Sequence, residues 1–269
     1  MTTREVFIDG IALWAPTLPG WDAARAAFRG EGICAEAPLR RPSAELLAPA
    51  ERRRAPDTVA LALEVGLRAI EASGHCAADL PSVFTSTHGD LGVTDYMCKT
   101  LVSTPTLVSP TKFHNSVHNA TAGYWTMATA CMQASTAISA YDCSFAAGLL
   151  EALVQCSAEE RPVLLVGYDI EACGALASTT SSRGMLAAAL VLSPQRGARS
   201  TATLSWSVQS TAALAPLALR SAAARSLAGN AMADCLPLFE ALADGSSEPL
   251  VMPLSSSLFL QIAPNGLSH

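Results

Sequence analysis

The chain has 269 residues, of which half are hydrophobic and only 15% are charged, and its mean hydropathy is +0.31. Such a chain can bury a large core and still leave apolar surface for a partner. Its formal net charge of −6 argues against nucleic-acid binding. It contains neither an apolar run of the ~20 residues that span a bilayer nor an N-terminal signal-peptide pattern. We therefore expect a cytoplasmic protein without a membrane span.

The first part of the chain alternates between strand and helix patterns. In chain order we expect a strand over residues 6–14, a helix over 21–28, a helix over 58–73 capped by Asp57, a strand over 82–87, and a helix from Asp90 to about Leu101. Residues 103–119 contain two prolines and no clear periodicity, so they predict a long loop. Loops of this length inside a compact domain are usually functional or interfacial.

The rest of the chain continues the alternation and then weakens. In chain order we expect a helix over residues 120–131, a strand over 134–141, a helix over 144–156, and strands over 163–170 and 185–192. Beyond Pro194 we expect a strand over 203–208, an ambiguous segment over 212–228, a helix over 230–243, and short strands over 250–254 and 258–262. Alternating strands and helices predict a layered α/β fold.

Two sets of residues carry no clear motif. Arginines at positions 40–41 and 52–54 form a basic cluster, which is either a solvated loop or a patch that steers an acidic partner. The eight cysteines contain no CxxC pair, so they predict neither a zinc ribbon nor a redox motif. We expect most of them to be small buried side chains, and we expect no metal and no cofactor.

The stretch SAYDCSFAAGLLEA places Asp142 and Cys143 where a predicted strand meets a predicted helix. The N-terminus of a helix carries a partial positive charge and free amides, which lower the pKa of a cysteine placed there. The same position also suits an aspartate that caps the helix. The residues alone therefore leave two interpretations open, a nucleophilic Cys143 or a capping Asp142.

Three stretches, FTSTHGD, FHNSVHNATAGYWTMATA and STAISAYDCSFAAGLLEA, resemble the N-terminal half of β-ketoacyl synthases. The resemblance covers residues 6–192 and is closest to a short branch of chain-length-factor-like proteins, which accompany an active ketosynthase in aryl polyene and xanthomonadin-type biosynthesis. It implies a thiolase-like α-β-α-β-α fold, normally dimeric. The whole chain, 1–269, would be one such domain, with a ketosynthase-like half over 1–193 and a reduced C-terminal half over 194–269.

The family's motif bears on the two interpretations of the junction. Asn119 and the Ala122-Gly123 pair match the family's helix before the nucleophile, and counting forward places Asp142 in the nucleophile's position. Cys143 lies one residue late, although a single gap would restore it. The family's catalytic histidines come from the C-terminal half, yet this chain has no histidine between His118 and His269, and no GFGGTN-like string near its end.

The resemblance therefore implies a non-catalytic subunit that forms a heterodimer with a catalytic ketosynthase, reaches acyl carrier protein through that complex, and shapes the acyl pocket in polyene, polyketide or fatty-acid-like biosynthesis. The alternative is a stand-alone condensing enzyme or acyltransferase that uses Cys143. A third interpretation is a homodimeric scaffold without an acyl role.

Several further residues are candidates for the pocket or the interface. By resemblance, His88 gates the end of the acyl pocket, although a simple strand-end turn explains it equally well. By resemblance, Phe113 and Ser116 fall where the family's loop crosses the dimer boundary, and Asn119 is a further candidate for the pocket or the interface. His114 and His118 have i, i+4 spacing, but no third ligand has motif spacing, so we interpret them as hydrogen-bonded histidines of an interface loop.

Overall fold

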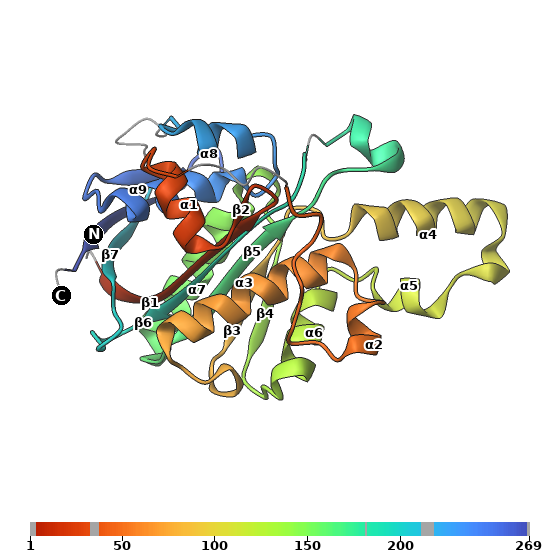
Figure 1. Ribbon diagram of the computed structural model, residues 1–269, viewed down its shortest axis with the longest axis horizontal. Coiled ribbons are helices and arrows are strands. Elements are labelled where there is room, and N and C mark those ends of the chain that lie inside the picture. Colours follow the sequence, from red (N-terminus) through yellow and green to blue (C-terminus); the bar gives the residue numbers. More distant parts are fainter. Residues whose placement is uncertain (1–3, 33–37, 181, 211–217, 268–269) are drawn as a thin grey trace.

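The computed structural model describes residues 4–32, 38–180, 182–210 and 218–267. Strands and helices alternate along most of the chain (Figure 1). The strands are β1 Arg4–Ala15, β2 Leu18–Pro19, β3 Ser82–Thr85, β4 Ser135–Ile138, β5 Val163–Asp169, β6 Leu186–Ser193, β7 Ala202–Gln209, β8 Leu250–Pro253 and β9 Phe259–Gly266. The α-helices are α1 Trp21–Phe28, α2 Pro49–Arg52, α3 Asp57–Ser73, α4 Leu91–Ser103, α5 Pro110–His114, α6 Ala120–Thr129, α7 Ser144–Glu159, α8 Ala222–Leu227 and α9 Leu236–Asp244. The 3-10 turns are η1 Ala77–Asp79, η2 Pro105–Leu107, η3 Tyr141–Cys143, η4 Gly174–Ser178 and η5 Ala233–Cys235.

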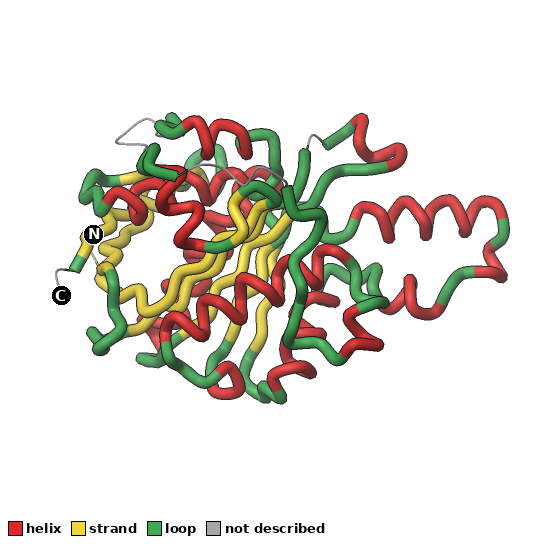
Figure 2. The backbone as a smooth tube through the Cα atoms, in the orientation of Figure 1, coloured by secondary structure: helices red, strands yellow, loops and turns green. Residues whose placement is uncertain are grey.

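The nine strands form one mixed sheet, drawn in yellow in Figure 2. Its order is β4-β3-β5-β6-β1-β7-β9-β8, and β2 pairs with β1. Strand β3 runs parallel to both β4 and β5, whereas the other pairs are antiparallel. Strand β4 therefore lies at one edge of the sheet, next to the junction that leads into α7.

Helices cover both faces of the central strands. Helix α3 crosses one face, and α7 packs on the opposite face (Figure 1). Alternate residues of β5 enter the two cores, with Val163 and Leu165 beneath α7 and Leu164, Val166 and Tyr168 beneath α3. Side chains on successive strand residues point to opposite faces, so burial on both faces explains why this strand is continuously apolar.

The part of the chain after residue 194 joins the same sheet. Strands β7, β9 and β8 extend it beyond β1, and α9 packs against α1 and β9. Helix α8 forms within the segment whose conformation the sequence left ambiguous, of which residues 211–217 lie outside the described residues. The division into halves at residues 1–193 and 194–269 stays a prediction.

Helices α4 and α5 extend away from the sheet as an arm on the right of Figure 1. Residues 103–119 are thus not the irregular loop that the sequence predicted. Proline can occupy the first turn of a helix because the amide it lacks would be unpaired there, and Pro105 and Pro110 begin η2 and α5 in this way. Among the described residues, no helix is long and apolar enough to cross a membrane.

The predicted α/β class is confirmed, and most elements lie within a few residues of their predicted bounds. The Asp90 cap is confirmed, because its side chain accepts a hydrogen bond from the Val93 amide at 2.8 Å. The Asp57 cap is wrong. Pro56 holds the cap position, and Asp57 is the first helical residue, 3.3 Å from the Arg41 guanidinium in an ion pair. A predicted helix over 230–243 begins only at α9, after η5.

Candidate functional site

The junction between β4 and α7 is a sharp turn built from η3. Tyr141 adopts the left-handed conformation with φ 51°, which is uncommon for a residue other than glycine. Ser144 stabilises the turn, because its hydroxyl donates to the Tyr141 carbonyl at 2.7 Å and accepts from the Ala140 amide at 3.0 Å. The chain therefore reverses direction immediately before the helix, and Asp142 and Cys143 lie on this turn.

The structure corrects the prediction that Asp142 caps α7. Cys143 holds the cap position and makes no side-chain cap bond, and Asp142 is exposed. The cap comes from a distant residue instead. Asp234 Oδ2 accepts hydrogen bonds from the amides of Phe145 at 3.0 Å and Ala146 at 3.4 Å. These are the first-turn amides that a capping side chain normally satisfies.

Cys143 is half-buried, and its surroundings disfavour a thiolate. Burial raises the pKa of the Cys143 thiol, and the nearby carboxyls of Asp234 and Asp142 raise it further. A nucleophilic cysteine needs the opposite, a lowered pKa or a neighbouring base. The described part of the chain shows no hydrogen bond between Cys143 and a histidine.

Four of the five histidines lie in the described residues, and each has another contact. The Nε2 atom of His75 lies 2.9 Å from Asp9 Oδ2, and the Nε2 atom of His118 lies 2.9 Å from the Ser86 carbonyl oxygen. The ring of His114 packs edge-on against Tyr124. His88 forms a short hydrogen bond with Thr180, and His269 lies outside the described residues.

A polar cavity of about 420 Å³ lies beside the turn. Its lining comes from η3, the turn that follows β3, the segment around η4, and η5 with the chain before it. It includes His88, Tyr141, Asp142, Thr180, Asn230 and Asp234. His88 thus lines a cavity, as a gate would, and its ring centroid lies 6.3 Å from that of Tyr141. Its role as a gate stays a prediction.

Two acids, the buried Asp169 and the half-buried Asp234, lie close to this cavity. Asp169, at the end of β5, accepts hydrogen bonds from the Ser86 hydroxyl at 2.8 Å and the Thr87 amide at 2.9 Å. Burial raises its pKa, and these hydrogen bonds oppose the shift. Burial also raises the pKa of Asp234 to about 8, against the lowering effect of the two α7 amides. Asp234 Oδ1 is buried and has no hydrogen-bond partner among the described residues.

Asn230 fixes the segment that carries Asp234. It is 5% exposed, and its Nδ2 donates to the carbonyls of Arg183 at 3.0 Å and Asp169 at 3.2 Å. Its Oδ1 accepts from the Met232 amide at 2.9 Å. The chain leading to Asp234 is thereby held against the ends of β5 and β6.

Phe113, Ser116 and Asn119 lie away from the cavity, on the molecular surface. Phe113 is 62% exposed on α5, and Ser116 is exposed after that helix. Asn119 holds the cap position of α6 without a side-chain cap bond. None of the three lines the cavity beside Tyr141, so a role in the acyl pocket or the interface stays a prediction for each of them.

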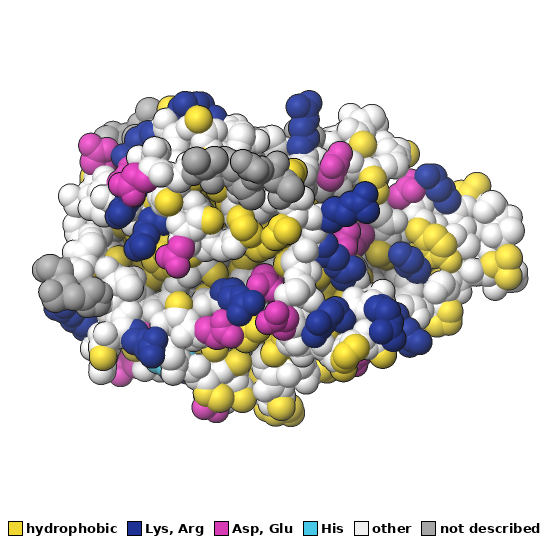
Figure 3. Space-filling model, viewed as in Figure 1, with side chains coloured by type: hydrophobic (Ala, Val, Ile, Leu, Met, Phe, Trp, Pro, Cys, Tyr) yellow, Lys and Arg dark blue, Asp and Glu magenta, His cyan; other side chains and the backbone are white. Residues whose placement is uncertain are grey.

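Exposed apolar side chains gather on the arm and near the β4 edge. They are Leu101, Val102, Leu107, Phe113, Val117, Met127, Met132 and Tyr141. Figure 3 shows apolar side chains at the end of the molecule formed by the arm. Met132, just before β4, is 94% exposed and Val102 is 89% exposed. A single chain gains nothing from exposing such large side chains, which are typical of a partner surface.

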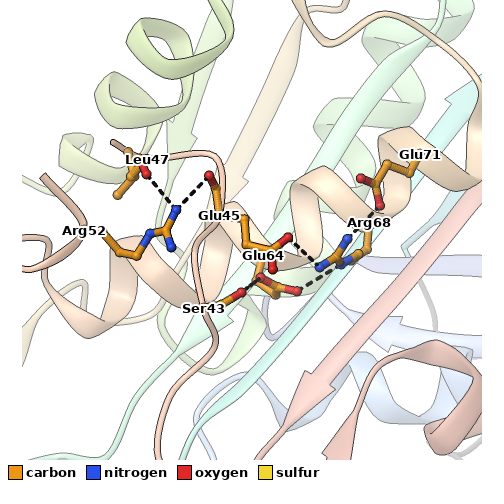
Figure 4. Close-up of polar contacts among 7 residues, drawn as sticks. All are labelled: Ser43, Glu45, Leu47, Arg52, Glu64, Arg68 and Glu71. Atoms are coloured by element: carbon orange, nitrogen blue, oxygen red, sulfur yellow. Dashed lines mark hydrogen bonds and ion pairs between the residues drawn. The ribbon is translucent and has the colours of Figure 1, made fainter. Parts of the chain in front are cut away.

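The basic cluster is partly structural. Arg52 donates to the carbonyls of Glu45 and Leu47, and Arg68 of α3 forms ion pairs with Glu45, Glu64 and Glu71 (Figure 4). These contacts hold the loop before α2 against α3. Arg53 and Arg54 line a separate cavity together with Lys112, and steering of an acidic partner stays a prediction for them.

Sequence analysis missed Asp234, Asn230 and Thr180. One signal was present, because the Asp-Cys pair at 142–143 recurs at 234–235, each time just before a helix. Nothing in the local sequence, however, indicates that the second pair contacts the first helix.

The comparisons with known proteins agree with the fold. A family model described as "Beta-ketoacyl synthase, N-terminal domain" matches residues 26–249, which is more than half of the chain. A comparison with curated proteins finds no match.

Three solved structures illustrate the likeness. One is the ketosynthase ApeO in complex with its chain length factor ApeC from Xenorhabdus doucetiae, with 24% identity, TM-score 0.70, and coverage of 96% of this chain and 98% of the matched chain. A second is the AntDE:AntF complex of a type II ketosynthase with its acyl-carrier protein, with 12% identity, TM-score 0.75, and coverage of 99% of this chain and 100% of the matched chain. A third is the ishigamide ketosynthase/chain length factor, with 13% identity, TM-score 0.70, and coverage of 98% of this chain and 100% of the matched chain. At these identities the likeness concerns the fold, and it confirms the predicted thiolase-like architecture. By the extent of its match to the family model, the chain belongs to the β-ketoacyl synthase family.

Proposed function

We propose that this chain is a non-catalytic, chain-length-factor-like subunit that pairs with a catalytic β-ketoacyl synthase and shapes the acyl pocket of the complex. The proposal rests mainly on the environment of Cys143 in the turn before α7. The only cysteine on this turn is flanked by two carboxyls that raise its pKa, and it has no histidine partner in the described residues. Nucleophile activation contributes orders of magnitude to the rate of acyl transfer, so its loss removes condensation.

The structural neighbours support the pairing. Two of them are complexes of a ketosynthase with a chain length factor, and the match covers nearly all of both chains. The matched chains are therefore of about the same length as this one. By analogy, the product class would be an aryl polyene, another polyene or a polyketide.

The surface of the chain supports a large interface. Strand β4 is at the edge of the sheet, and an unprotected edge strand can pair with another chain. Val102 and Leu107 on the arm and Met132 beside β4 are 89%, 70% and 94% exposed. Stable interfaces bury such apolar groups at their centre. Phe113, Ser116 and Asn119 belong to the same proposal, as residues that contact the partner or its pocket.

The remaining parts of the proposal follow from the pairing. The catalytic partner would receive acyl groups from an acyl carrier protein, which this chain would meet through the complex, as AntDE meets AntF in its own structure. The seven described cysteines are all free, which supports a location in the reducing cytoplasm.

Purification from the natural host tests the proposal. A tagged copy of the chain is isolated, and its partners are identified by mass spectrometry. We expect a full-length ketosynthase in a 1:1 complex, which Val102→Glu with Leu107→Glu should disrupt, because two charges would be buried in the interface. Leu258→Glu, an exposed apolar position on the β8–β9 turn, is the matched control and should leave the complex intact. A monodisperse homodimer without a ketosynthase, or acylation of Cys143 by an acyl thioester, would contradict the proposal.

A further inference from the structure

The first turn of α7 is an anion site that the chain fills with its own carboxyl group. Helix α7 has 16 residues, so its N-terminus presents free amides and a partial positive charge. Asp234 Oδ2 accepts hydrogen bonds from two of these amides, those of Phe145 and Ala146. A cysteine at the cap position, where Cys143 lies, would need the same amides to stabilise its thiolate.

The position of Asp234 is enforced by its surroundings. The buried Asn230 ties its segment to the ends of β5 and β6. Met232 is fully buried, and a side chain added at Gly167 of β5 would lie 2.9 Å from both Met232 and Phe145. The first turn of α7 and the segment of Asp234 therefore pack over the same point of the sheet.

We propose that Asp234 is a positioning residue that suppresses the reactivity of Cys143 by occupying the α7 amides that would otherwise stabilise its thiolate. This inference rests on the proposed non-catalytic function and names the residue responsible for it. The second observation is Asp234 Oδ1, which is buried beside the polar cavity and has no partner among the described residues. A buried carboxyl with an unpaired oxygen is costly for the fold, which indicates that this side chain serves the site.

The ionisable groups around Asp234 also disfavour ionisation of Cys143. Asp169 at the end of β5, Cys143 of η3 and Cys235 of η5 interact with Asp234 electrostatically, and Asp142 and His88 line the same cavity. Because Asp234 has a pKa of about 8, it gains its charge over the pH range in which a thiol would ionise. Each of the two ionisations opposes the other.

Alkylation of the full chain with iodoacetamide tests the inference, because the thiolate displaces iodide and forms a stable thioether. The rate at each cysteine is followed by peptide mass spectrometry between pH 6 and pH 10. The exposed Cys76, Cys98 and Cys173 serve as internal references. In the wild type we expect Cys143 to react several-fold more slowly than Cys98.

Two substitutions separate the effect of the Asp234 charge from the effect of its hydrogen bonds to the α7 amides. Asp234→Asn keeps an oxygen for the amides and removes the charge, whereas Asp234→Ala removes both. At pH 7.5 we expect the Cys143 rate to rise about 3-fold in Asp234→Asn and about 10-fold in Asp234→Ala, since one pKa unit corresponds to a tenfold change in thiolate. The pH profile of Cys143 should move to lower pH in both variants, and the buried cysteines described below distinguish this shift from the one that loosened packing would cause. Asp142→Asn is the matched control for charge and should raise the rate less than Asp234→Ala, because Asp142 raises the pKa of the thiol but makes no contact with these amides.

The buried cysteines report whether each variant is folded. Cys156 and Cys235 are fully buried and should stay unlabelled; if Asp234→Ala exposes them, Asp234→Asn decides the test. Folded variants in which Cys143 keeps its wild-type rate and pH profile would overturn the role of Asp234 and leave the proposed function intact. A wild-type Cys143 that reacts faster than Cys98 would overturn this inference, and capture of an acyl group from a thioester would overturn the proposed function.

Discussion

The chain contains two Asp-Cys turns, and they have opposite environments. Asp142-Cys143 in η3 precedes α7, and Asp234-Cys235 in η5 precedes α9. Asp142 is exposed and caps nothing, whereas Asp234 is half-buried, has a buried Oδ1 and caps the helix of the other turn. Cys143 is half-buried, whereas Cys235 is fully buried, and burial raises its pKa well above the ordinary value.

The difference shows that a local motif does not determine how its own residues are used. The nearest acid to the start of α7 is Asp142, yet the bond from Phe145 goes to Asp234, 89 positions along the chain. The amides at the start of a helix donate to any suitably placed oxygen, so the choice depends on which acid the fold brings close. Here Asn230 and Met232 bring Asp234 close. Three predictions test this contrast.

Gly167→Val should break the contact between the two turns and has the largest expected effect. A side chain at this position would meet both Phe145 and Met232 at 2.9 Å, so we expect a loss of about 3 kcal/mol in the free energy of unfolding. Urea denaturation measures it. Gly123→Ala is the control, because no atom lies within 4 Å of the added group, and alanine should stabilise α6 by about 0.5–1 kcal/mol. Equal stability of Gly167→Val and the wild type would contradict the packing.

Asp234 should make stability depend on pH. The unfolded aspartate loses its proton near pH 4, whereas the folded one keeps it up to about pH 8. Its contribution is therefore complete below pH 4 and is lost as the pH rises towards 8. Relative to Asp234→Asn, the wild type should lose about 2 kcal/mol of stability between pH 5 and pH 7. Urea denaturation at several pH values measures this. A wild type and an Asp234→Asn variant with parallel pH profiles would show that Asp234 is not buried as a neutral acid.

His88→Ala should have the smallest effect on stability, and it tests the function of the cavity between the turns. Loss of its bond to Thr180 should cost about 1 kcal/mol, measured by urea denaturation. If His88 gates the acyl pocket, the purified complex of the variant chain with the ketosynthase should make products of a different chain length, measured by mass spectrometry. Products of unchanged length would remove His88 from the gate and leave it as a residue of the strand-end turn.

Sequence analysis succeeded where local interactions determine the structure and was less accurate where contacts between distant residues determine it. The apolar run of β5 and the periodicity of α3 predicted those elements, because both patterns are local consequences of which faces are buried. The predicted bounds of the elements were less accurate where tertiary contacts determine them. Strand β4 has only four residues, and the arm folds into helices where prolines suggested a loop.

For the candidate site, the sequence located the turn but not its chemistry. The strand and helix patterns placed Asp142 and Cys143 at the junction, and the structure places both on η3. The role of Asp142 as a cap was wrong, and Asp234 was not considered. An aspartate far along the chain carries no local sign that it will reach another helix.

The sequence by itself thus determined the α/β class, the membership in the β-ketoacyl synthase family and the position of the turn before α7, because these depend on hydrophobic periodicity and contiguous motifs. Only the tertiary structure decided which carboxyl occupies the helix end, which cysteine remains accessible and which acid keeps its proton near neutral pH. Those outcomes depend on burial and on contacts between distant segments, and an isolated stretch of sequence contains neither.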